Sequence, residues 1–193
     1  MKYCTIDTES GSRRASSTLL SAAFLITNDH FEVLDQLDLK LKLEKDGLYI
    51  VDAQGMAVNG IDIVAHDKVA MTYKEAKPVL YEFLKKNSNG ERLTPVGHGV
   101  KGDIHRIVEN LISQGSWEQF CTYHYIDTSV VLQFLRACGK MPQDCDGSVG
   151  ALVQYFGIEL GDRSLHDAMV DAQLTMQVYQ KMVELERSVE SLC

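Results

Sequence analysis

The sequence predicts an α/β fold in which helices flank a mixed sheet of about five strands. Residues 1–45 carry three apolar runs typical of strands, and the chain after residue 90 alternates short apolar runs with helical patterns, which implies parallel pairing. A length of 193 residues with 45% hydrophobic content is enough for one sizeable core. We therefore expect one domain over residues 1–193.

The first region is expected to form a three-stranded antiparallel meander. The predicted strands span residues 3–7, 19–27 and 31–43. In the third strand every second residue from 37 to 43 is leucine, with charged residues between, a period of two that marks a strand with one face in water. Asn28 and Asp29 supply the turn before this strand.

The next segment is predicted to lead from the meander into helices. A loop is expected from Gly47 to Gly60, followed by helices at residues 61–67 and 72–86. Thr72 and Glu75 have the spacing of a capping box, which makes Thr72 the N-cap of the second helix.

Strands and helices then alternate along the chain. We expect strands at residues 93–97 and 122–126, and helices at residues 104–113 and 129–137. Two further helices are expected at residues 148–156 and 164–189. The last ten residues are polar and are expected to fray.

Composition limits the classes of function. A net charge of −8 argues against a protein that coats nucleic acid, but a nuclease needs positive charge only locally. The five cysteines are scattered without a C-x-x-C pair and are expected to be reduced thiols. The chain opens directly into a strand rather than a signal peptide, and no apolar stretch has membrane-spanning length. We expect a cytoplasmic protein that does not enter a membrane.

Two acidic residues at the end of the first strand are the clearest sign of chemistry. Asp7 and Glu9 are separated by one residue. Because successive side chains on a strand alternate between faces, both point from the same face and can converge on one cation.

Two further acidic residues follow predicted strands. Asp103 lies between a strand and a helix, where it is either a ligand in an active site or the N-cap of a helix starting at Ile104. Asp127 ends the fifth strand, and capping of the next helix is its better interpretation. We therefore keep Asp103 as a candidate ligand and leave Asp127 out.

The last candidate pair is His166 and Asp171. Ser164 and Asp167 have capping-box spacing, which predicts a helix that begins at Ser164 with His166 in its first turn. A step of five residues turns a helix by roughly 140°, so the pair can address one centre only if His166 reaches sideways from a loosely wound start. Otherwise His166 is a surface or capping residue.

Taken together, these residues resemble the motifs of a known enzyme family. Asp7-Thr8-Glu9, Asp103 and His166-x4-Asp171 occur in the order and approximate spacing of the three motifs of the DEDDh, or DnaQ-like, 3′-to-5′ exonucleases. The resemblance covers about residues 2–183. It extends to segments Asn59-Gly60-Ile61, Ile126-Asp127-Thr128, residues 152–158, Ala168 and Asp171-Ala172.

The resemblance implies an RNase H-like fold that binds two Mg²⁺ or Mn²⁺ ions, which favour carboxylate ligands. Asp7, Glu9 and Asp171 would hold one ion, and Asp7 and Asp103 would hold the ion on the leaving-group side. His166 would be the general base. The residues implied in substrate binding are Thr8, Asn59, Gly60 and Ile61. The implied reaction removes nucleoside 5′-monophosphates from the 3′ end of single-stranded DNA or RNA.

The second motif departs from the family pattern. Gly99 and Gly102 stand where the family usually has Asn and an aromatic residue. After Glu9, Arg13 and Arg14 are either phosphate contacts or part of a solvated loop.

Other functions share parts of this pattern. An RNase H-type endonuclease shares the fold and the acids, but its mechanism does not call for His166. A catalytically weak or inactive binding module on the same fold is the alternative from a different class. Self-association as a homodimer, or pairing with a polymerase or another protein, is left open.

Overall fold

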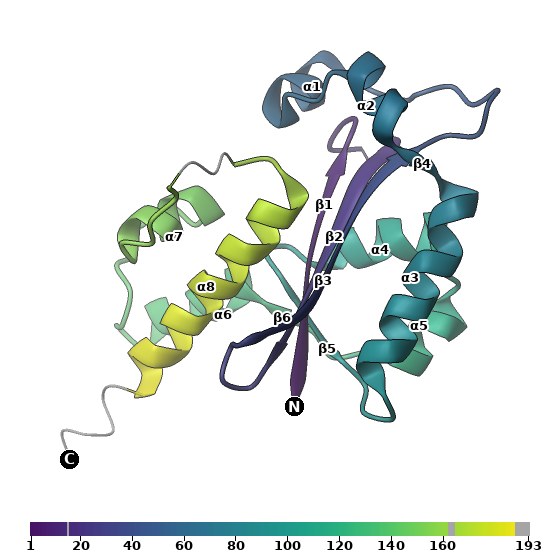
Figure 1. Ribbon diagram of the computed structural model, residues 1–193. Coiled ribbons are helices and arrows are strands. Elements are labelled where there is room, and N and C mark those ends of the chain that lie inside the picture. The colour runs from purple at the N-terminus through teal and green to yellow at the C-terminus, as the bar shows by residue number, and fades with distance from the viewer. Residues whose placement is uncertain (15, 162–164, 188–193) are drawn as a thin grey trace.

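The structure of the protein is a computed structural model that describes residues 1–14, 16–161 and 165–187 (Figure 1). Its strands are β1 (Lys2–Ser10), β2 (Leu19–Asn28), β3 (Val33–Lys42), β4 (Met71–Thr72), β5 (Thr94–Gly97) and β6 (Ile126–Asp127). Among the described residues they form one sheet in the order β4-β3-β2-β1-β5-β6. The predicted α/β fold with a mixed sheet is therefore confirmed.

The sheet joins an antiparallel half to a parallel half at β1. The predicted meander is confirmed, because β1 pairs antiparallel with β2, and β2 pairs antiparallel with β3. On its other side β1 pairs in parallel with β5, which pairs in parallel with β6. The sequence did not predict β4, a two-residue strand parallel to β3, because so short a segment has no readable period.

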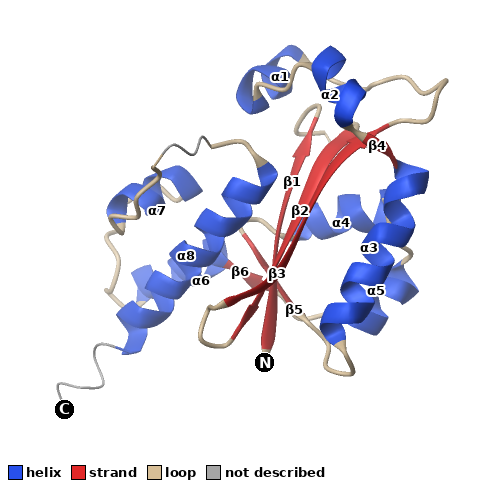
Figure 2. Cartoon of the chain, in the orientation of Figure 1, coloured by secondary structure: helices blue, strands red, loops and turns tan. Residues whose placement is uncertain are grey.

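Helices cover both faces and one end of the sheet (Figures 1 and 2). One face carries α6 (Thr128–Ala137), α7 (Val149–Tyr155) and α8 (Ala168–Arg187), and the other carries α3 (Tyr73–Ser88), α4 (Lys101–Asn110) and α5 (Gln114–Phe120). The short helices α1 (Ala53–Asn59) and α2 (Ile63–Val69) lie above the end where β1 finishes.

Helix caps explain where the prediction succeeded and where it was wrong. The capping box of Thr72 and Glu75 at the start of α3 is present. The segment expected to be a loop contains α1, whose N-cap Asp52 accepts a hydrogen bond from the Gly55 N–H. The sequence also missed α5, which Ser113 caps. Both missed helices have only seven residues, a length at which the helical period is an unreliable signal, although α2 and α7, of the same length, were predicted.

The start of α8 corrects the sequence-based interpretation. The helix begins at Ala168, not at residue 164, which lies outside the described residues. Asp167 Oδ1 accepts hydrogen bonds from the N–H groups of Met169 (3.1 Å) and Val170 (3.2 Å), so Asp167 acts as the cap. His166 has a φ of 72° and precedes the helix instead of lying in its first turn.

Alternation along β1 directs its side chains to two different layers. Ile6 belongs to the apolar core between the sheet and helices α3 to α5. Asp7 points to the other face, where its cross-strand partner Ala23 packs on Ala168 and Ala172 of α8. The end of β1 therefore presents carboxylates to the first turns of α8.

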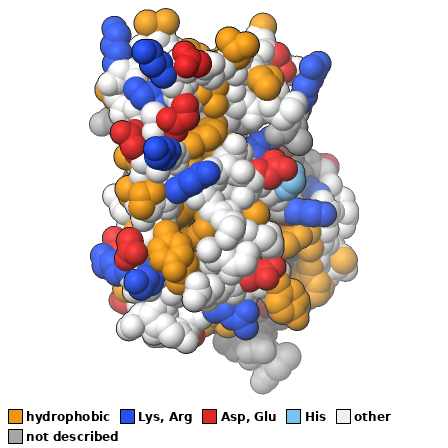
Figure 3. Space-filling model, turned by 90° about the vertical axis from the view of Figure 1, so that its right-hand side faces the viewer, with side chains coloured by type: hydrophobic (Ala, Val, Ile, Leu, Met, Phe, Trp, Pro, Cys, Tyr) orange, Lys and Arg blue, Asp and Glu red, His pale blue; other side chains and the backbone are white. Residues whose placement is uncertain are grey.

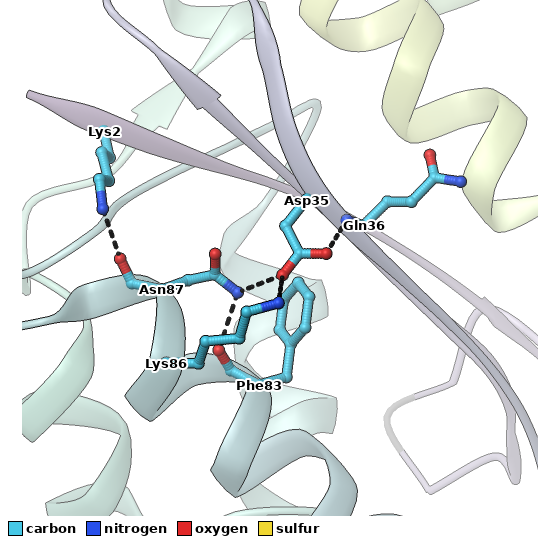
Figure 4. Close-up of polar contacts among 6 residues, drawn as sticks. All are labelled: Lys2, Asp35, Gln36, Phe83, Lys86 and Asn87. Carbon is cyan, nitrogen blue, oxygen red and sulfur yellow. Dashed lines mark hydrogen bonds and ion pairs between the residues drawn. The ribbon is translucent and has the colours of Figure 1, made fainter.

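A polar network joins β1, β3 and α3 at the end of the sheet away from α1 (Figure 4). Asp35 Oδ2 accepts hydrogen bonds from Lys86 Nζ (2.8 Å) and Asn87 Nδ2 (2.9 Å). Lys2 Nζ donates to the Asn87 carbonyl oxygen at 2.9 Å. The Lys86 hydrogen bond holds the pKa of Asp35 below its ordinary value. This network fixes the strands at the end opposite to the acidic residues of β1.

Candidate metal centre

Three of the predicted residues come together at the start of α8. Glu9, His166 and Asp171 each offer a ligand atom, and these atoms lie within 4.8 Å of one another. The N–H of His166 donates to Asp171 Oδ2 at 3.0 Å. Because His166 adopts a positive φ, it reaches the centre from outside the helix while Asp171 reaches it from the first turn. The five-residue spacing is therefore compatible with a single centre.

Asp103 is buried and points toward β1. It is not the N-cap of α4, because that helix begins at Lys101 and its N-cap Val100 makes no side-chain cap hydrogen bond. Asp103 Oδ1 instead accepts a hydrogen bond of 2.5 Å from the Thr8 hydroxyl. The capping interpretation of Asp103 is thus wrong, and its carboxylate lies next to β1.

Burial and neighbouring carboxylates raise the pKa of the acidic side chains at this centre. Burial, followed by Asp103, Asp171, Glu9 and Asp167, holds the pKa of Asp7 well above its ordinary value. Burial and the neighbouring carboxylates raise the pKa of Glu9 to about 8. Burial raises the pKa of Asp103 to about 6 and also raises that of Asp171. So many carboxylates in a partly desolvated place favour a bound cation.

The donor atoms fit a hard divalent ion. Asp171 Oδ1 is buried and has no hydrogen-bond partner among the described residues. A buried acceptor without a partner is costly, and a cation would satisfy it. Carboxylate oxygens are the ligands that Mg²⁺ and Mn²⁺ favour, so the residues present fit such ions.

Two cavities meet at Glu9. The larger, of about 410 Å³, has Asn59, Ile61 and His166 among its lining residues. The smaller, of about 190 Å³, lies beside Thr8 and reaches α4 at Arg106. Glu9 thus stands between two spaces that a bound molecule can enter.

The loop after α1 is held against the end of β1. Asn59 Nδ2 donates to the Ser10 carbonyl oxygen at 3.1 Å, and Asn59 Oδ1 accepts the Ile61 N–H at 3.0 Å. Gly60 ends α1 with a φ of 64°, in the left-handed region that glycine adopts without strain. The Asn59 amide therefore fixes the loop, and Ile61 is left facing the larger cavity.

Asp127 caps the next helix, as the sequence predicted. Its Oδ1 accepts the Ser129 N–H at 3.0 Å, and it also accepts the Gly99 N–H at 3.0 Å. Gly99 has a φ of 74°, which accounts for glycine at this position. Glycine at position 99, where the family pattern usually has Asn, is therefore explained by the backbone that links the end of β5 to Asp127 of β6.

Sequence reasoning missed two charged residues of the site. Arg106 lines the smaller cavity, and its charge offsets part of the rise in the pKa of Glu9 and Asp103. The available signal was the spacing from Asp103 to Arg106, one helical turn. Asp38 lines the larger cavity, and burial raises its pKa. The position of Asp38 on β3 places it at the site only once the pairing of the strands is known.

Comparison with solved structures places the fold in a defined class. The chain shares its fold with exonucleases whose structures are known, including a DEDDh family member. Family models and curated protein sequences give no match. Among the described residues, every helix is too short or too polar to cross a membrane.

Two solved structures illustrate the likeness. Escherichia coli exonuclease I in complex with a dT13 oligonucleotide matches with a TM-score of 0.77 and 14% identity over 99% of this chain and 43% of that chain. The nuclease domain of 3′hExo, a DEDDh family member bound to rAMP, matches with a TM-score of 0.70 and 14% identity over 95% of this chain and 92% of that chain. The chain thus spans less than half of exonuclease I and nearly all of the 3′hExo domain.

Proposed function

We propose that the protein is a metal-dependent 3′-to-5′ exonuclease that removes nucleoside 5′-monophosphates from single-stranded DNA or RNA. The observation that carries this proposal is the convergence of Glu9, His166 and Asp171, next to Asp7 and Asp103, at the end of β1. Exonuclease I and 3′hExo, solved with a dT13 oligonucleotide and with rAMP respectively, support the substrate class.

Four carboxylates would hold two Mg²⁺ or Mn²⁺ ions. Asp7, Glu9 and Asp171 would bind one, and Asp7 and Asp103 would bind the other. Bound divalent ions supply positive charge that stabilises the attacking and leaving oxygens of a phosphodiester. A zinc-bound form of exonuclease I with single-stranded DNA is among the structural matches, which supports a metal site in this fold.

His166 would accept the proton of the attacking water. Its side chain is exposed at the mouth of the centre, and its backbone N–H is fixed by Asp171. The hydrogen bond uses the backbone of His166, so it holds the residue beside the carboxylates without engaging the imidazole ring. A general base in such a position contributes about 10²- to 10⁴-fold to rate.

The larger cavity would receive the terminal nucleotide. Asn59 and Ile61 line it directly, and Gly60 leaves open space above the loop. Thr8 would act from the other side of β1, where its hydroxyl orients Asp103. The protein is expected to work in the cytoplasm, in keeping with the free thiols of the described cysteines.

A digestion assay tests the proposal. A single-stranded oligonucleotide labelled at its 5′ end is incubated with the protein and Mn²⁺, Mg²⁺ or a chelator. We expect products that shorten from the 3′ end only with metal, and nucleoside 5′-monophosphate as the released product. Internal cuts would indicate an endonuclease, and binding without cleavage would indicate a binding module; either result would overturn the proposal.

A further inference from the structure

We propose that the smaller cavity is a phosphate-binding pocket in which Arg106 holds a phosphate of the nucleic-acid strand. The inference rests on the proposed exonuclease function and names a contact to the part of the strand that stays bound. The lining residues that carry it are Thr8, Ser10, Ser12, Arg13 and Arg106.

The chemistry of the cavity suits an anion on one side. Arg13 and Arg106 supply two guanidinium groups at its wall, and Ser12 of the loop after β1 adds a hydroxyl group. The Thr8 and Ser10 hydroxyls line the cavity but already donate to Asp103 Oδ1 and to the Ser12 carbonyl oxygen. Guanidinium groups bind phosphate through pairs of parallel N–H donors. Glu9 and Asp52 also line the cavity, so the anion would lie toward the arginines.

Arg106 has a buried donor that nothing in the described chain satisfies. Its Nε is shielded from solvent and has no hydrogen-bond partner there. Leaving a buried donor unpaired costs stability, and a phosphate that draws the guanidinium into the cavity and accepts a hydrogen bond from it would remove that cost. The arginine lies one helical turn after Asp103 on α4, which directs it to the same side as the metal centre.

Glycine at position 102 leaves room for this side chain. A Cβ atom at Gly102 would stand 3.4 Å from Arg106 Nη1, an ordinary van der Waals contact. The guanidinium therefore lies beside a position with no side chain. The departure from the family pattern at Gly102 thus lies next to the guanidinium that we assign to phosphate binding.

The position of Arg106 indicates which phosphate it binds. The terminal nucleotide would lie in the larger cavity, on the His166 side of Glu9. Asp103 serves the leaving-group side in the proposed mechanism, and Arg106 follows it along α4. Arg106 therefore contacts the phosphate on the 5′ side of the bond that is cut.

Dinucleotides with and without a 5′-phosphate test this assignment. Only the phosphorylated form offers a second phosphate, so wild-type protein should cleave it with a kcat/KM about 10- to 100-fold higher, the range expected for hydrogen bonds to a charged group. Arg106→Met should cleave both at similar kcat/KM. If Arg106 only balanced the charge of the carboxylates, Arg106→Met would cleave both dinucleotides more slowly by the same factor and would keep the preference for the phosphorylated one.

Direct binding gives a second readout. In the Asp7→Asn background, which preserves the strand, fluorescence anisotropy measures the affinity for a single-stranded oligonucleotide across salt concentrations. Loss of one phosphate contact should reduce the slope of log affinity against log salt by about 0.7. The matched control is Arg92→Met. Arg92 is exposed and precedes β5 at the opposite end of the sheet, so its replacement should leave the salt slope and the 5′-phosphate preference unchanged.

The outcomes separate this inference from the proposed function. If wild-type protein degrades the labelled strand but Arg106→Met keeps both the 5′-phosphate preference and the salt slope, the phosphate pocket is wrong and the exonuclease stands. If wild-type protein degrades nothing, the exonuclease is wrong. Should Arg106→Met fail to fold, Arg106→Lys serves instead. It keeps the charge without the paired donors, and an undiminished preference in that variant would also overturn the pocket.

Discussion

At the residue scale, the centre depends on one unusual backbone conformation. His166 has a positive φ, which a residue other than glycine adopts only at a cost. Here the N–H that this conformation exposes donates to Asp171 Oδ2, and the two side chains meet Glu9. The strain thus coincides with the place where a histidine is brought to a carboxylate cluster.

Replacement of His166 should affect rate more than metal binding. We expect His166→Ala to lower kcat by about 10²- to 10⁴-fold, because the general base is lost. The 3′-end digestion assay at saturating Mn²⁺ measures the change. His30→Ala, in an exposed turn between β2 and β3, is the control. A wild-type rate in His166→Ala would shift the role of base to Asp167 or a water chain.

Replacement of Asp171 should abolish both activity and stabilisation by metal. Asp171→Asn removes a charge from the centre, and the loss of several kcal/mol of charge stabilisation corresponds to a fall of about 10³-fold or more. Thermal unfolding with and without Mn²⁺ should show a shift in wild-type protein that the variant lacks. Asp7→Asn is expected to behave in the same way. Asp29→Asn, with the same charge change in an exposed turn, should retain both properties, and equal metal shifts in all variants would contradict this role.

At the element scale, α1 forms a wall of the smaller cavity because two backbone segments approach closely. A Cβ atom at Gly55 would lie 2.5 Å from the Gly11 carbonyl oxygen, so only glycine permits this packing. The Asp52 N–H also donates to the Gly11 oxygen at 2.9 Å. Together these contacts hold α1 over the end of β1.

A methyl group at Gly55 should push α1 away from the loop after β1. We expect Gly55→Ala to cost about 1–3 kcal/mol of stability, the usual range for overpacking, and to raise the KM for a single-stranded substrate. Gly115→Ala is the matched control, since a Cβ at that position in α5 meets nothing within 4 Å. It should be neutral or slightly stabilising. An unchanged KM in Gly55→Ala would show that α1 does not shape the site.

At the scale of the whole molecule, the positions of the charged residues are more informative than the net charge. The chain carries a net charge of −8, and on the face shown in Figure 3 basic and acidic side chains lie interspersed. The centre gathers carboxylates whose pKa values are raised, while Asp35 at the other end has a lowered pKa. The two ends of the sheet should therefore respond to pH in opposite directions.

Variants of single carboxyl groups, measured in the presence of chelator, show how much each group contributes to the pH dependence of stability. Glu9 has a folded-state pKa of about 8, above its unfolded value, so its ionisation destabilises the fold progressively as pH rises from about 4.5 to 8. Glu9→Gln should gain in Tm relative to wild type over this window, by about 2–4 °C per kcal/mol recovered. A Tm difference that does not grow with pH would contradict the raised pKa.

Asp35 provides the control with the opposite sign. Its depressed pKa gives stability that is present above the ordinary carboxyl range and is lost as pH falls through the folded value. Asp35→Asn should therefore be less stable than wild type at neutral pH and approach the wild-type stability in acid.

Addition of Mg²⁺ or Mn²⁺ should raise the wild-type Tm more at pH 8 than at pH 5, because protons compete for the carboxylates.

Much of the fold follows from the sequence because the signals are local. The alternation of leucines predicted β3, and the spacing of Thr72 and Glu75 predicted the start of α3. Asp127 was identified as a cap for the same reason. The seven-residue helices α1 and α5 and the two-residue strand β4 were missed. Elements of this length carry a weak period, and only α2 and α7 among the seven-residue helices were predicted.

By itself, the sequence determined the acidic residues, their order and the face that Asp7 and Glu9 share. Only the tertiary structure decided that Asp103 points to Thr8 rather than caps its helix, that His166 precedes α8, and that Arg106 and Asp38 line the site. These features depend on which strands pair and which helix ends approach them, contacts between residues far apart in the chain that no local pattern records.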